Sequence, residues 1–96
     1  MRPAARVGDS GIPHCGPYTI ATGSQNVFIN GLPAARVGDS STTHLKPGGD
    51  SCVPHVSTIA SGSTSVFING RPAARVGDPL TACTAIATGS PTVFIG

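Results

Sequence analysis

One seven-residue segment, Pro-Ala-Ala-Arg-Val-Gly-Asp, occurs three times in the 96 residues of this chain, at 3–9, 33–39 and 72–78. A second phrase, close to Thr-Ile-Ala-Thr-Gly-Ser and followed shortly by Val-Phe-Ile, comes after each copy. Such self-similarity indicates one supersecondary unit repeated three times along the chain.

The junctions between units predict how the repeats close. Asn30-Gly31 and Asn69-Gly70 follow Val-Phe-Ile in the first two copies. This dipeptide favours the two-residue turn of a β-hairpin. The third copy stops at Gly96, which aligns with the two asparagines, while Met1 aligns with the two glycines. We therefore predict that the termini lie side by side and that three hairpin units close into a pseudo-threefold ring.

Composition predicts a single all-β domain over residues 1–96. The chain contains 13 Gly and 9 Pro, and no segment has the 3.6-residue periodicity of a helix. Large apolar side chains are few, so the core must be thin and a cross-link is expected. We interpret Phe28, Phe67 and Phe94 as a shared core layer. Strand alternation places each Phe opposite its Val and Ile neighbours, and at least one of these sides is open to a partner.

The charged residues exclude one class of partner. The net charge is +2, too small for a nucleic-acid footprint. Each repeat has an Arg three residues before an Asp, and we interpret these as ion pairs that stabilise the loop. Catalysis by the three carboxylates is the alternative interpretation. No signal peptide, transmembrane stretch or lipidation motif is visible, so we expect synthesis in the cytoplasm without a conventional export signal.

The loops between the recurring phrases carry potential metal ligands. His14, His44 and Cys83 each stand five residues after the Asp of a repeat. The middle loop encloses eighteen residues, against nine and six in the other two, and it adds Cys52 and His55. Structural zinc is almost always tetrahedral, with Cys and His ligands. The spacing predicts one structural zinc ion held by His14, His44, His55 and Cys83; an alternative set has Cys52 in place of His55.

The remaining cysteines have several interpretations. Cys15 directly follows His14, and adjacent side chains in extended chain point apart, so only one of the two faces the axis easily. Cys15 and Cys52 are interpreted as small, partly buried hydrophobic residues. A Cys15–Cys52 disulfide is the alternative, although an odd count of three cysteines is a poor disulfide framework.

The thrice-repeated Pro-Ala-Ala-Arg resembles the signature of the PAAR-repeat proteins, and the resemblance covers the whole chain. It implies a small β-rich cone, one per trimer, that caps the blunt end of VgrG, the trimeric β-helical spike of the type VI secretion system. It also implies a zinc ion near the vertex, held by three His and one Cys. Carried over to this sequence, the ligands are His14, His44, His55 and Cys83.

The function that the resemblance implies is structural. The tip, a monomer in isolation, sharpens the spike for puncture of the target envelope, contacts the target membrane transiently and helps to attach effectors. The apparatus secretes it into the medium or a target cell. We expect no appended effector domain. The equivalent tip of a contractile phage tail or tailocin baseplate is the alternative. A zinc hydrolase is a remote one, because it requires an open coordination position and a base, and the chain contains no Glu.

Overall fold

The computed structural model describes residues 1–13, 15–49 and 51–96, and these residues contain eight short β-strands and no helix. The molecule is elongated, with extents of 40 × 24 × 21 Å. No helix of the described residues is long and apolar enough to cross a membrane. The strands are β1 (Arg2–Pro3), β2 (Phe28–Ile29), β3 (Leu32–Pro33), β4 (His44–Gly48), β5 (Ser51–His55), β6 (Phe67–Ile68), β7 (Arg71–Pro72) and β8 (Phe94–Ile95).

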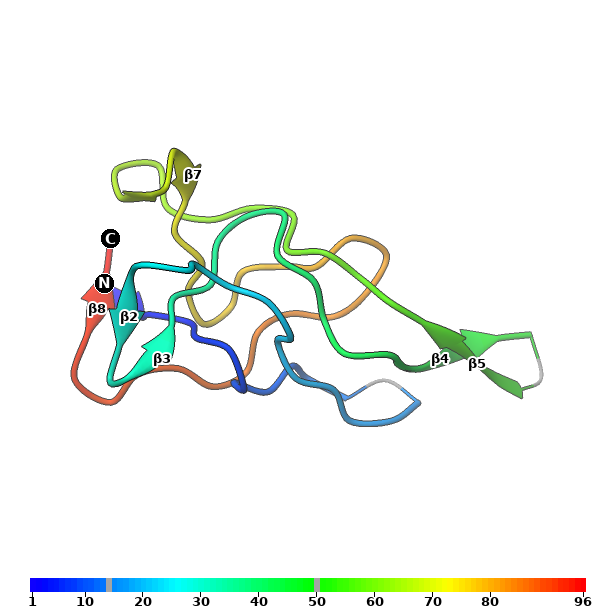
Figure 1. Ribbon diagram of the computed structural model, residues 1–96. Helices are drawn as coiled ribbons and strands as arrows, with labels where there is room; N and C mark the ends of the chain where they lie inside the picture. Colours follow the sequence, from blue (N-terminus) through cyan, green and yellow to red (C-terminus); the bar gives the residue numbers. More distant parts are fainter. Residues whose placement is uncertain (14, 50) are drawn as a thin grey trace.

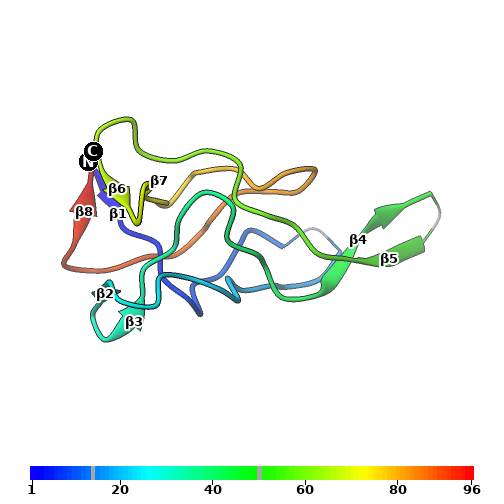
Figure 2. The same ribbon diagram turned by 45° about the horizontal axis from the view of Figure 1, so that its top comes forward.

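Three of the four two-stranded sheets are equivalent. β2 pairs with β3 and β6 with β7, both antiparallel, across turns in which Asn30 and Asn69 have φ of 53° and 55°. β1 pairs with β8 in the same register, so the third hairpin is made from the two ends of the chain. Figure 1 and Figure 2 show the two termini together beside this hairpin. The predicted closed ring with adjacent termini is confirmed.

The Pro-Ala-Ala-Arg segments close the ring through their backbones. The amide of Ala35 donates to the carbonyl of Ala5, that of Ala5 to Ala74, and that of Ala74 to Ala35, each over 3.0 Å. The three alanines are at most 1% exposed. A larger side chain at these positions would hold the segments apart, because close-packed interiors leave no room for added methylene groups. The repeated alanine is therefore the condition for three backbones to meet at one axis.

Two apolar layers lie on either side of this ring. The layer toward the three hairpins contains Ala4, Ile29, Ala34, Ile68, Ala73 and Ile95. The layer toward the loops contains Ala5, Tyr18, Ile20, Ala35, Ile59, Ala74, Leu80 and Ile86. We call the hairpin side, made of β1–β8, β2–β3 and β6–β7, the broad end. The opposite side, made of β4, β5 and the loop residues 10–13, 15–18 and 79–84, is the narrow end (Figure 1).

The interpretation of the phenylalanines as a core layer was wrong. Phe28, Phe67 and Phe94 are 46–57% exposed, whereas the isoleucine after each of them is 6–8% exposed. Successive side chains of a strand point to opposite faces, and the branched isoleucines fill the limited space beside the alanines. The rings therefore lie on the outside of the broad end.

The interpretation of the Arg–Asp pairs as loop-stabilising contacts agrees with the structure. Arg6 Nε and Nη2 donate to the two oxygens of Asp9 over 2.9 and 3.0 Å, and the Arg6 amide donates to Asp9 Oδ2 over 2.8 Å. The other two repeats have the same three contacts within 0.1 Å. The hydrogen bonds that the Arg6 side chain donates to Asp9 raise the pKa of Arg6. Each acid is thus paired inside its own tight turn.

Candidate metal centre at the narrow end

Two histidines and a cysteine converge where the three units meet at the narrow end. One ligand atom from each of His44, His55 and Cys83 lies within 4.8 Å of the others. His44 begins β4 and His55 ends β5, and the two are directly opposed in the antiparallel register. Their rings meet edge to face with centroids 4.6 Å apart. The hairpin of the second unit therefore supplies two potential ligands through one pairing, and the third unit supplies the sulfur.

The His44 ring is held in one orientation. Its Nδ1 lies 2.8 Å from the carbonyl oxygen of Thr42. A carbonyl can only accept, so Nδ1 carries a proton, and in the neutral form of this ring Nε2 presents the lone pair. Nε2 lies 3.4 Å from Cys83 Sγ. A backbone carbonyl on the second ring nitrogen is the usual support of a metal-ligating histidine, and His44 is 4% exposed.

A tight turn of the third unit positions Cys83. The Cys83 amide donates to Leu80 O over 3.2 Å, and the Leu80 amide donates to Thr84 O over 2.9 Å. Between them Ala82 has φ of 52°, a left-handed conformation that is uncommon for residues with a side chain. This geometry turns the Cys83 side chain toward the histidines of the second unit.

Tyr18 of the first unit completes the wall behind His44. The two rings stack with centroids 4.2 Å apart and an interplanar angle of 19°. The Thr84 hydroxyl donates to the Ile12 carbonyl, so Tyr18 Oη donates to Thr84 Oγ1 over 2.9 Å. Burial, the largest effect, raises the pKa of Tyr18 to about 12. The phenol stays neutral and serves as a packing surface.

The sequence interpretation gave no role to Tyr18 or to Gly11. A side chain at position 11 would overlap the Tyr18 ring. The equivalent positions of the other units are Ser41 and Leu80. The sequence did contain a signal for this packing. The first unit has a glycine where the other two have larger residues, and it is also the unit that contains the one tyrosine of the chain.

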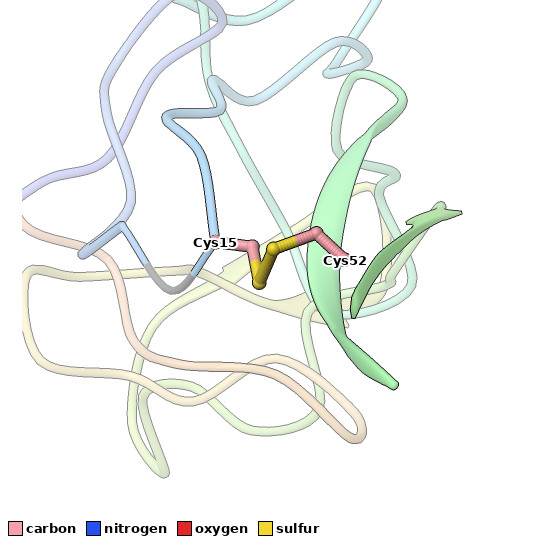
Figure 3. The surroundings of a disulfide bond; sticks show 2 residues. All are labelled: Cys15 and Cys52. Atoms are coloured by element: carbon pink, nitrogen blue, oxygen red, sulfur yellow. A yellow bond between two sulfur atoms is a disulfide. The ribbon is translucent and has the colours of Figure 1, made fainter. Parts of the chain in front are cut away.

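A disulfide joins Cys15 to Cys52 across a separation of 37 residues. Figure 3 shows Cys15 on the loop of the first unit and Cys52 on β5 of the second. Of the two interpretations left open for these cysteines, the structure shows the disulfide. The odd cysteine, Cys83, belongs to the cluster of potential metal ligands. Cys52 is committed to the disulfide, and His55 takes the place in the cluster.

The donor set fits a transition metal. Two imidazoles and a thiol are the ligand types that bind zinc in structural sites, and the support of His44 agrees with this role. The cluster could therefore hold a metal ion. The fourth predicted ligand, His14, lies outside the described residues.

A comparison with protein families identifies the chain. The model of the PAAR motif matches residues 1–44 and again residues 49–96. The chain belongs to the PAAR-motif family. No curated protein matched the chain in a sequence comparison.

Family membership gives the observed architecture a biological setting. PAAR-motif domains are structural spike-tip domains, and the motif implies a spike-tip role in a type VI secretion system or a related contractile system. The motif's alanines are the residues that form the backbone ring of this PAAR-motif chain, and its arginines form the Asp-paired turns. The residues of the family signature are thus the ones that join the three units and stabilise their turns.

Proposed function

We propose that this protein caps the blunt end of a trimeric VgrG β-helix, with one tip on each trimer. The observation that carries the proposal is the closed pseudo-threefold ring, which presents three equivalent phenylalanines outward at its broad end. A single chain of this kind matches a partner with true threefold symmetry. A trimeric β-helix ends in unpaired strand edges, which require a cover.

Apolar surface at the broad end supports docking there. In addition to the three outward-facing phenylalanines, the valine that precedes each of them is 37% exposed and Leu32 is 39% exposed. Exposed apolar groups gathered on one face commonly indicate a protein interface. Aromatic side chains contribute most of the binding free energy in such interfaces.

The narrow end is suited to mechanical work. We propose that one structural zinc ion is held by His14, His44, His55 and Cys83, so that four protein ligands close the coordination sphere. The Cys15–Cys52 disulfide joins the same loops. Metal binding is worth on the order of 10 kcal/mol in small zinc domains, and it would stiffen an end that has little core. A rigid point serves puncture of the target envelope and transient contact with its membrane.

The proposed role is structural and not enzymatic. A hydrolytic zinc needs an open coordination position and a nearby base. Four protein ligands fill the proposed site, and the chain contains no Glu. We further propose that the protein is made in the cytoplasm as a monomer and leaves the cell on the spike, into the medium or a target cell. Effectors that attach to it would leave by the same route.

Docking is tested with the three phenylalanines replaced together by serine. The probe is a purified trimeric VgrG-type spike fragment from the same genome. Wild-type protein should co-elute with it at one chain per trimer, and the triple variant should lose at least tenfold in affinity while keeping its melting temperature. Ile12→Ser and Leu45→Ser, which remove exposed apolar groups at the narrow end, are the matched controls. A triple variant that binds like wild type, or a wild type that does not bind, would overturn the proposal.

A further inference from the structure

The position before each Pro-Ala-Ala-Arg segment breaks the threefold symmetry in charge. This position holds Arg2 in the first unit, Leu32 in the second unit and Arg71 in the third unit. Arg71 Nη2 lies 3.6 Å from Asp39 Oδ1, and Arg2 Nη2 lies 3.3 Å from Asp78 Oδ1. The two arginine side chains are 43% and 45% exposed. Both guanidinium groups are therefore within reach of solvent or of a docked protein.

A polar hollow of about 330 Å³ lies beside one of these arginines. It lies between the segment that follows the first Pro-Ala-Ala-Arg copy, the second copy and the β6–β7 hairpin. Its lining residues are Gly23, Gln25, Asn26, Arg36, Asn69 and Arg71.

The inner wall of the hollow is fixed by hydrogen bonds. Arg36 Nη1 donates to Asn69 Oδ1 over 2.9 Å, and the Ser24 hydroxyl donates to the same oxygen over 2.7 Å. Asn69 Nδ2 donates to Asn26 Oδ1 over 2.8 Å. These contacts hold the amide groups and the Arg36 guanidinium in place before any ligand arrives. Pre-organisation of this kind lowers the entropic cost of binding.

The charges around the hollow do not cancel. Arg36 and Arg71 carry two positive charges against the single carboxylate of Asp39. That carboxylate already accepts two hydrogen bonds from the Arg36 side chain and one from its amide. The 3.6 Å separation of Arg71 from Asp39 exceeds hydrogen-bond length. Arg71 therefore keeps donors in the planar fork that matches a carboxylate.

We propose that Arg71, with the hollow beside it, and the equivalent Arg2 each bind a carboxylate side chain of the spike protein on which the tip docks. This inference rests on the proposed docking function. A trimer repeats its surface three times, so the acidic residue that meets Arg71 also meets Arg2 and Leu32. At the third equivalent position the tip has Leu32, so the partner's acidic residue has no arginine to pair with there.

The test is a binding titration against the same spike fragment at 50 mM and 500 mM KCl. Arg71→Leu and Arg2→Leu should each weaken binding about fivefold at low salt, and by much less at high salt, because ion pairs at an interface rim are screened. Leu32→Arg should strengthen binding about fivefold at low salt. Lys46→Leu removes the same charge from β4 at the narrow end and should leave the affinity unchanged.

The outcomes separate this inference from the docking proposal. Wild-type binding that is insensitive to salt, with the arginine variants and Leu32→Arg unchanged, would overturn the carboxylate contacts while docking stands. A wild type that fails to bind would overturn both. Equal weakening by Lys46→Leu would show a general charge effect and contradict the assigned positions. Melting temperatures of the variants confirm that each is folded before it is titrated.

Discussion

The broad and narrow ends of this molecule are built from the same three units by different means. At the broad end the Val7, Val37 and Val76 amides each donate over 2.9 Å to the proline carbonyl of a neighbouring unit. At the narrow end the first unit contributes a tyrosine, the second a hairpin with two histidines, and the third a cysteine turn. The repeated segments thus form equivalent hydrogen bonds in all three units. The loops, whose sequences differ, are instead connected by contacts that occur once each.

The difference follows from the space available for apolar packing. The broad end has the alanine ring and three isoleucines to bury, so ordinary packing suffices. Toward the narrow end the loops separate, and β4 and β5 project away from the other units (Figure 2). No residue of β4 or β5 belongs to either apolar layer, and small domains with thin cores rely on disulfides or metals for stability.

The largest effect should come from removing a ligand at the narrow end. Cys83→Ala should release the bound metal and lower the melting temperature by at least ~20 °C, because most of the metal-binding free energy is lost. His44→Ala should do the same and also lose its stacking on Tyr18. Elemental mass spectrometry and calorimetry provide the measurements.

A chelator distinguishes the metal from simple packing in this experiment. Chelation should bring the wild type down to the stability of Cys83→Ala and should not affect the variant further. If the wild type binds no metal, or its melting temperature is unaffected by the chelator, the metal-centre assignment is wrong.

An intermediate effect should come from the disulfide, also at the narrow end. Cys52→Ser should destabilise the oxidised protein by about 4 kcal/mol, because a cross-link between residues 37 apart restricts the unfolded chain. Metal content should stay intact, since Cys52 is not in the cluster. Cys15→Ser, or the wild type in reductant, should show the same loss in denaturant unfolding. Loss of zinc in Cys52→Ser would instead assign that sulfur to the metal.

The smallest effects test the symmetry of the broad end. A methyl group added at Gly23, Gly62 or Gly89 would lie 2.5–2.8 Å from the carbonyl oxygen of an alanine in the ring segments. Each Gly→Ala change should therefore cost about 1–3 kcal/mol, and the three costs should agree within about 0.5 kcal/mol. At the narrow end Gly16→Ala meets only an ordinary contact of 3.8 Å with Leu45 and should be nearly neutral. Three unequal losses would mean that the hairpin units are not equivalent.

The sequence predicted the broad end better than the narrow end. The Asn-Gly turns, the aligned ends of the chain and the Arg–Asp spacing each determine local backbone geometry, so the ring followed from them. The Phe rings were wrongly predicted to be buried. The alternation of side chains along a strand places Phe and Ile on opposite faces, but it does not show which of the two faces packs against the alanines. At the narrow end, spacing nominated His44, His55 and Cys83, but the disulfide required the loop of one unit to meet the hairpin of another. That encounter depends on tertiary structure.

The alanine ring also has a consequence for how the protein folds. Each ring segment donates to one neighbour and accepts from the other, and Ala5 at the start of the chain donates to Ala74 near its end. No unit can complete its hydrogen bonds until the third has been synthesised. Contacts of such long sequence separation slow folding, and exposed strand edges in the growing chain favour aggregation. The nascent chain is therefore expected to stay unfolded until its last strand leaves the ribosome, and then to fold in a single cooperative step.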